Sequence, residues 1–186
     1  MCRYRGAVLL VVAATPGELR GAAGASTLVC GVGPVEAAAR TATALADLQP
    51  TAVLNVGLAG ARHFAGIGFV VGSEAIYSDA DDPYWIVLRL SPSERLARAA
   101  RRALPDARFE PIGMTARVAS STGCEVEAME GYSVLRAAAL AGVPAVEVRV
   151  LANAVGEPDR AKWQLTDASD TLAAVLPRLI QEVSRA

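Results

Sequence analysis

Residues 27–61 read TLVCGVGPVEAAARTATALADLQPTAVLNVGLAGA, and their pattern of apolar residues decides the class of fold. An apolar run at 27–33 precedes an Ala-rich segment with helical periodicity at 36–48, and a second apolar run follows at 52–60. Apolar runs that alternate with helices are typical of a parallel-type sheet covered by helices. The stretch therefore predicts an α/β fold.

The same alternation continues on both sides of this stretch. A β-branched segment at 68–82 ends in acidic turn residues, and Gly142 and Pro144 end a helical pattern before the next apolar run. The further strands we expect are 7–14, 84–90 and 145–152, and the further helices are 93–104, 131–142 and 169–186. A chain of 186 residues fits one domain, so we expect residues 1–186 to form a single domain.

Composition excludes several classes of function. With 53% hydrophobic and 20% charged residues the chain is globular, and a net charge of -1 argues against nucleic acid as a partner. No apolar run approaches the ~20 residues of a membrane helix, so we expect no membrane partner. Three cysteines without metal-ligand spacing predict neither a disulfide framework nor a metal site, and they favour the cytoplasm. The segment 1–17 imitates a signal peptide, but its apolar run is also typical of a buried strand.

Three local motifs are better explained without a ligand. The segment GVGPVEAA at 31–38 resembles a dinucleotide-binding turn, but Glu36 replaces the third glycine and would repel a pyrophosphate. His63 is the only histidine and has no nucleophile elbow to serve, so we expect it in a surface loop. The aspartates at 79–82 lack the spacing of a calcium loop and indicate a solvated turn.

Polar residues at the ends of separate apolar runs form the stronger candidate site. Glu18 follows the first expected strand, Glu130 begins a helix, and Arg149 and Asn153 lie near the end of a later strand. In open α/β sheets, ligands bind beyond the carboxyl ends of the strands, where these residues would converge. Each residue also has a structural interpretation. The two glutamates suit helix N-termini, Arg149 suits a pair with Glu147 or Glu130, and Asn153 suits a turn.

Together these segments resemble the nucleoside phosphorylase and nucleosidase superfamily, in the order that the family has. The segments at 11–18, 31–38 and 54–61 resemble 5'-methylthioadenosine/S-adenosylhomocysteine nucleosidases. The segment VEAMEGYSVLRAAALAGVPAVEVRVLANAVGEPDRAKW at 126–163 is more similar to futalosine hydrolases, which act in menaquinone biosynthesis. The resemblance implies a three-layer α/β/α fold with a central mixed sheet. The implied activity is hydrolysis of the N-glycosidic bond of a purine nucleoside.

The resemblance also assigns roles to individual residues. Glu18 is expected to orient and deprotonate the attacking water, and Met129 and Glu130 to hold the ribose. Arg149 is expected to position the water and the acidic groups, and Asn153 to contact the leaving purine. An asparagine offers both an N–H and a carbonyl oxygen, which suits a 6-oxopurine such as the base of futalosine or inosine.

Further positions complete the expected pocket. Ala59 and Gly60 match the small residues that let the backbone approach the base, and Trp163 falls where the family has a pocket wall, although a core tryptophan fits its pattern nearly as well. Asn55 replaces the arginine with which phosphorylases of the superfamily bind phosphate, so we expect water rather than phosphate as the nucleophile. Futalosine is the first substrate to test.

The resemblance implies no cofactor, and it implies a homo-oligomer, a dimer or higher, with sites near subunit interfaces. Leu58 and Ala152 replace serines of the family, and the segment between Arg117 and Glu127 is shorter than in relatives. These departures leave alternatives open. The chain could be a phosphate-dependent purine nucleoside phosphorylase, a methylthioadenosine/adenosylhomocysteine nucleosidase, or a nucleoside-binding relative with weak catalysis.

Overall fold

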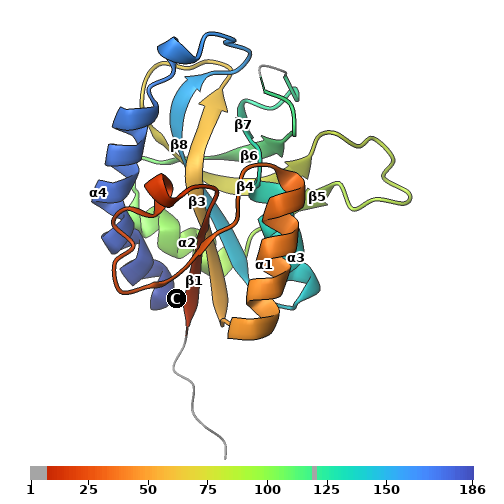
Figure 1. Ribbon diagram of the computed structural model, residues 1–186, viewed down its shortest axis with the longest axis vertical. Coiled ribbons are helices and arrows are strands. Elements are labelled where there is room, and N and C mark those ends of the chain that lie inside the picture. The colour runs from red at the N-terminus through yellow and green to blue at the C-terminus, as the bar shows by residue number, and fades with distance from the viewer. Residues whose placement is uncertain (1–7, 119–120) are drawn as a thin grey trace, which may run out of the picture.

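An eight-stranded mixed sheet forms the centre of the computed structural model, which describes residues 8–118 and 121–186 (Figure 1). Its strands run in the order β2-β1-β3-β7-β6-β4-β5, and β8 pairs with both β3 and β4. The strands are β1 (Leu9–Ala13), β2 (Ser26–Val29), β3 (Ala52–Ala61), β4 (Phe69–Tyr77), β5 (Arg89–Leu90), β6 (Arg108–Met114), β7 (Val126–Ala128) and β8 (Ala145–Ala154). The helices are α1 (Pro34–Leu48), α2 (Glu94–Ala103), α3 (Gly131–Leu140) and α4 (Leu165–Ser184), with short 3-10 turns η1 (Pro16–Leu19) and η2 (Arg160–Lys162).

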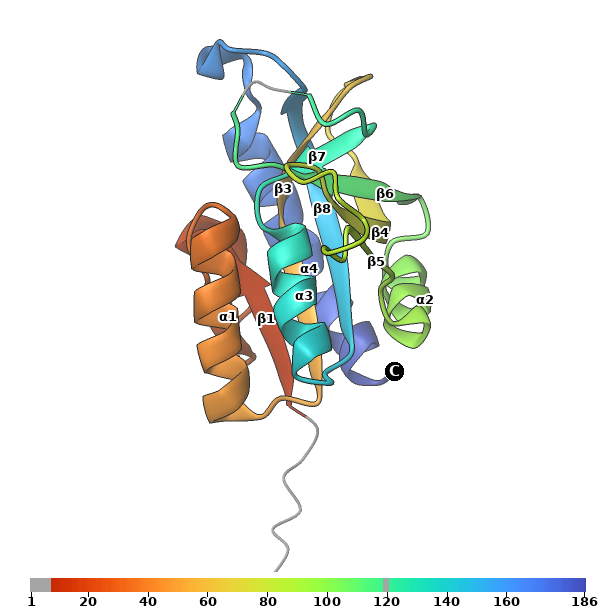
Figure 2. The same ribbon diagram turned by 90° about the vertical axis from the view of Figure 1, so that its right-hand side faces the viewer.

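Helices cover both faces of the sheet, and each face has its own apolar core (Figure 2). Helices α1 and α3 pack on one face, and α2 and α4 pack on the other. Alternate residues of β3 serve the two cores, since Val53 points to the α1/α3 side and Leu54 to the α2/α4 side. The three-layer α/β/α architecture with a mixed sheet is confirmed.

Strand β3 changes partner along one of its edges. Near its start it pairs in parallel with β1 through Ala52–Asn55, and at its end it pairs antiparallel with β7 through Gly60–Ala61. Its other edge pairs with β8 along almost its whole length. Among the described residues, no strand therefore lies beside 56–59 on the first edge, and the candidate site lies at this opening.

The sequence predictions fail in two places. Of the strand expected at 84–90, only Arg89–Leu90 pairs with β4. The rest lies in a long connection that projects from the body (Figure 1), where Asp82 accepts hydrogen bonds from the backbone of Tyr84 and Ile86 and holds a turn. Strands β6 and β7 were not predicted. Pro111 interrupts the alternation of β6 and lies at a register shift, which is where a sheet tolerates proline.

Some predictions lie outside the described residues. Cys2 and the first seven residues of the signal-like segment 1–17 lie outside the described part, whereas the rest of that segment contains β1 and the start of η1. The extent of the single domain over 1–186 stays a prediction. Within the part that the structure describes, no helix combines the length and the apolar character needed to cross a bilayer.

Candidate active site

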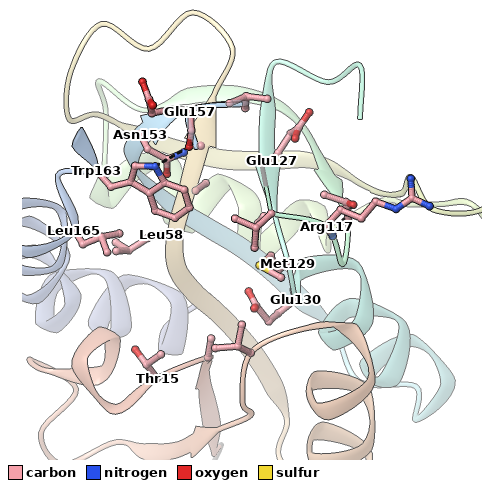
Figure 3. A pocket seen from close by; sticks show the side chains of 18 of the residues that line it. Thr15, Leu58, Arg117, Glu127, Met129, Glu130, Asn153, Glu157, Trp163 and Leu165 are labelled. Atoms are coloured by element: carbon pink, nitrogen blue, oxygen red, sulfur yellow. Dashed lines mark hydrogen bonds between the residues drawn. The ribbon is translucent and has the colours of Figure 1, made fainter. Parts of the chain in front are cut away.

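A cavity of about 360 Å³ opens at the carboxyl ends of β1, β3 and β8 (Figure 3). This volume falls within the range of small-molecule sites, roughly 300–1,000 Å³. The predicted residues that line it are Glu18, Ala59, Gly60, Met129, Glu130, Asn153 and Trp163. Arg149 does not line the cavity, because its side chain is fully buried beneath it.

Glu18 is fixed by three hydrogen bonds at the opening in the sheet. Its Oε2 accepts from the backbone N–H and the hydroxyl of Thr15, at 2.9 and 2.8 Å, and its Oε1 accepts from the N–H of Leu58 at 2.9 Å. The Thr15 contacts form the capping box of η1, so the helix-start interpretation is correct for this residue. The bond to Leu58 goes beyond capping, because it uses a main-chain donor that neither β1 nor β7 reaches.

Glu130 precedes α3 but does not cap it. Its side chain makes no hydrogen bond to the helix; instead, Oε1 accepts from the N–H of Gly33 at 3.0 Å. Burial raises the pKa of the Glu130 carboxyl above its usual range, although Arg149 and the Gly33 N–H act in the opposite direction. Figure 3 shows this carboxyl directed into the cavity, below Met129. The glycine turn at 31–38 thus donates a backbone hydrogen bond to a carboxylate of the protein itself, that of Glu130.

Arg149 is surrounded by carboxylates. Its Nε donates to Glu147 Oε1 at 2.7 Å, and its Nη1 lies 3.8 Å from Glu130 Oε2. Burial alone would lower the pKa of the guanidinium, but Glu147 and Glu130 outweigh it and raise the pKa, so Arg149 stays charged. Both pairings considered from the sequence are present. Gly57 leaves room for this arrangement, since a Cβ there would lie 2.3 Å from Nη1 and 2.7 Å from Glu18 Oε1.

Asn153 ends β8 beside the small residues of β3. Its Nδ2 donates to the carbonyl of Ala154 at 2.9 Å, which fixes the orientation of the amide. A Cβ on Gly60 would approach Nδ2 to 3.0 Å, so this glycine allows the close approach. One N–H and Oδ1 of the amide have no partner among the described residues, and both remain for a ligand.

Trp163 lies at the rim of the cavity rather than in the core. Its indole Nε1 donates to the carbonyl of Glu157 at 3.0 Å, shown as the dashed line in Figure 3. The guanidinium of Arg160 stacks 5.6 Å from the ring centroid. The hydrogen bond and the stacked cation fix the ring as a wall of the cavity.

Sequence reasoning missed three of the groups that support these side chains: Thr15, Gly33 and Gly57. Glu147 was considered from the sequence as a partner of Arg149, and the two residues lie two positions apart in a strand that is otherwise apolar, and therefore share a face. Cys30 also lies near the cluster. Burial, followed by the charge of Glu130, raises the pKa of its thiol to about 11, so it is unreactive at neutral pH.

Neither His63 nor the aspartates at 79–82 line the cavity. His63 is exposed and pairs with Glu125 at 2.7 Å, as expected for a surface loop. Asp79 accepts hydrogen bonds from Thr115 and from the N–H of Ala116, at 2.8 and 2.7 Å, so it links two loops.

Fold and site together define an α/β protein whose small-molecule pocket lies over a cluster of buried charges. Residues 11–181 match the model of the Phosphorylase superfamily, and the chain belongs to this family. The chain is 34% identical over 184 residues to the futalosine hydrolase of Streptomyces coelicolor, covering 80% of this chain and 78% of the relative.

Two solved structures have the same fold. One is the 5'-methylthioadenosine/S-adenosylhomocysteine nucleosidase of Colwellia psychrerythraea in complex with adenine, with a TM-score of 0.85, 17% identity and 96% coverage of both chains. The other is the native futalosine hydrolase of Helicobacter pylori, with a TM-score of 0.84, 16% identity, and coverage of 95% of this chain and 98% of that chain.

Proposed function

We propose that the chain hydrolyses the N-glycosidic bond of a purine nucleoside, with futalosine or a related 6-oxopurine nucleoside as substrate. One observation carries the proposal: Glu18, Glu130 and Asn153 line a single cavity, and Arg149 lies buried beneath it, 3.8 Å from Glu130. The identity of 34% with a futalosine hydrolase over 80% of the chain supports the choice of substrate.

Glu18 suits the role of the base that activates water. Thr15 and the N–H of Leu58 hold both of its carboxylate oxygens, so the group is oriented before the substrate arrives. A carboxylate held in this way can take a proton from a water that attacks the anomeric carbon, and it loses no rotamer freedom in doing so.

Glu130 and its neighbours suit a sugar that becomes cationic as the bond breaks. Glu130 is available to accept hydrogen bonds from the ribose hydroxyls, and these bonds strengthen as the ring gains positive charge. The carboxylates of Glu18, Glu130 and Glu147 surround a single guanidinium, that of Arg149. The charges around the site therefore favour an oxocarbenium-like transition state over the neutral nucleoside.

Asn153 suits a 6-oxopurine. Because one N–H of its amide is already bonded to Ala154, the other N–H and Oδ1 form a donor and acceptor pair. A 6-oxopurine offers a carbonyl oxygen to the donor, and the acceptor suits a purine N7 that is protonated on leaving. Trp163 and Val118 add apolar walls for the base.

Water is a better nucleophile than phosphate for this site. Asn55, at the position where phosphorylases of the superfamily have arginine, is buried in β3 and is neutral. Arg149 is fully buried and already engaged by carboxylates, so a phosphate dianion would enter a site with an excess of negative charge. Hydrolysis follows from this balance of charge.

We extend the proposal to the setting of the enzyme. The futalosine substrate implies a step of menaquinone biosynthesis in the cytoplasm, and the family resemblance implies a homo-oligomer. Gel filtration with light scattering measures the oligomeric state, and a monomer would contradict this part of the proposal.

The test is chromatography of the base released from futalosine, inosine, methylthioadenosine and adenosylhomocysteine, each with and without phosphate. We expect hypoxanthine from futalosine at a rate that does not depend on phosphate. Release that requires phosphate would establish phosphorolysis, and adenine release alone would establish a methylthioadenosine/adenosylhomocysteine nucleosidase.

The Glu18→Gln variant tests the mechanism. It should lose turnover while it still binds substrate, because the base is removed and the shape is kept. Full activity of this variant would remove Glu18 from the mechanism. Tight binding without turnover by the wild type, unchanged in Glu18→Gln, would instead indicate a nucleoside-binding relative.

A further inference from the structure

Glu147 is a buried carboxylate outside the cavity. It is 1% exposed and is absent from the cavity lining, so it does not touch a ligand there. Its Oε1 accepts from Arg149 Nε at 2.7 Å, and this is the shorter of the two ion pairs that the structure gives Arg149. Glu147 thus lies one layer behind the residues that face the substrate.

Glu147 lies between the first turn of α3 and Asn55 of β3. A Cβ on Gly131 would lie 2.0 Å from Glu147 Oε1, so the carboxylate lies against the first turn of α3. The N-terminus of a helix stabilises a negative charge. On the sheet, Asn55 is the neighbour of Glu147 in register. Neither its amide nor Glu147 Oε2 has a hydrogen-bond partner in the described part of the chain.

The contact at Nε determines where the rest of the guanidinium points. With Nε held by Glu147, Nη1 lies over Gly57 and faces both Glu18 and Glu130, and it forms a close pair with neither. Pairs between arginine and a carboxylate are frequently bidentate. Without Glu147, Arg149 would be expected to close on Glu130 and to occupy the oxygen that is needed for the ribose.

We propose that Glu147 is a positioning residue for the reaction: it holds Arg149 by Nε, so that Glu18 and Glu130 keep their oxygens for water and ribose. This inference rests on the proposed function. Glu147 also supplies a counter-charge for the guanidinium, which leaves the charges of the two cavity carboxylates for the substrate.

Steady-state kinetics of futalosine hydrolysis by Glu147→Leu and Glu147→Gln tests this role. Leucine removes the acceptor for Nε, and we expect kcat to fall about 100-fold, the effect of a misplacement near 1 Å, with little change in KM. Glutamine keeps an oxygen for Nε, so it should restore most of kcat. Thr41→Val is the matched control, because Thr41 is also fully buried and has a hydroxyl without a partner, but lies outside the cluster.

The pH profile separates positioning from a merely structural role. The titratable and charged groups that the structure places around Glu130 are Glu18, Cys30, Glu147 and Arg149. Burial is the main cause of the raised pKa of Glu130, and the charge of Glu147 adds to it, so in Glu147→Gln the acidic limb of the kcat profile should move to lower pH. A Glu147 whose charge does not act on the site would leave this limb unchanged.

The outcomes distinguish the two proposals. An active wild type with Glu147→Leu folded and equally active overturns the positioning role alone. If Glu147→Leu does not fold, then an unshifted acidic limb in Glu147→Gln overturns the role, and a limb shifted to lower pH supports it. An inactive wild type overturns the proposed function and this inference with it.

Discussion

Gly57→Ala should disable the site by displacing Arg149. A Cβ at this position would lie 2.3 Å from Arg149 Nη1, whereas ordinary contact begins at 3.4 Å, so Nη1 must move by about 1.1 Å (3.4 − 2.3). The Cβ would also lie 2.7 Å from Glu18 Oε1, so both groups must shift. A misplacement near 1 Å typically costs about 100-fold in rate. Overpacking of this kind costs roughly 1–3 kcal/mol of stability.

The assay compares kcat for base release and the melting temperature of Gly57→Ala with those of Gly68→Ala. Gly68 is the matched control, because a Cβ there meets nothing within 4 Å. Neither glycine has a positive φ, so the added methyl group and not backbone strain is tested. We expect a folded Gly57→Ala with kcat reduced about 100-fold and an unchanged control. A folded Gly57→Ala with wild-type kcat would refute the reasoning that Arg149 and Glu18 must keep these positions.

Two further predictions concern the base and the ribose carboxylate. Asn153→Asp should change the preference from hypoxanthine to adenine nucleosides by about tenfold, the worth of ~1.4 kcal/mol, measured as a ratio of kcat/KM; an unchanged ratio would remove Asn153 from base selection. The raised pKa of Glu130 has consequences for both activity and stability. Activity should fall on acidification at a pH above 4.5, the ordinary value of a glutamate, because Glu130 must be ionised to accept hydrogen bonds. The folded state holds this proton more tightly than the unfolded state, so the stabilisation is complete below pH 4.5 and is lost as pH rises through the folded pKa. Glu130→Gln should lack this loss in melts across the same pH range, and a curve identical to that of the wild type would contradict it.

The sequence predicts the parts of the molecule whose signals are local. Strand and helix periodicity is enough to predict β1, β3, β8 and the four helices, and the polar residues that follow strands are enough to bring Glu18, Glu130 and Asn153 to one edge. Their assigned catalytic roles stay proposals. The pattern does not show which distant segments pair with each other in the sheet. The segment at 84–90 has strand-forming residues but finds a sheet neighbour only at Arg89–Leu90.

The same limit applies inside the site. Gly33 and Glu130 are far apart in the chain, and no spacing in the sequence indicates that the N–H of one binds the carboxylate of the other. The need for glycine at 57 likewise depends on where Arg149 lies after folding. Glu147 is the exception, because two charges on one face of a buried strand require each other, and that requirement can be read from the sequence alone.

The hydrogen bond from the Leu58 N–H to Glu18 makes the position of Glu18 independent of the side chain at position 58. Because the main chain makes this bond, the side chain at position 58 can vary in size and polarity, and so alter the substrates admitted, while the proposed base keeps its place. A leucine stands at this position. Substrate range can therefore diversify at this position without loss of the chemistry. An extension of β1 by a few residues, in contrast, would compete for the same N–H and would remove this hydrogen bond to Glu18.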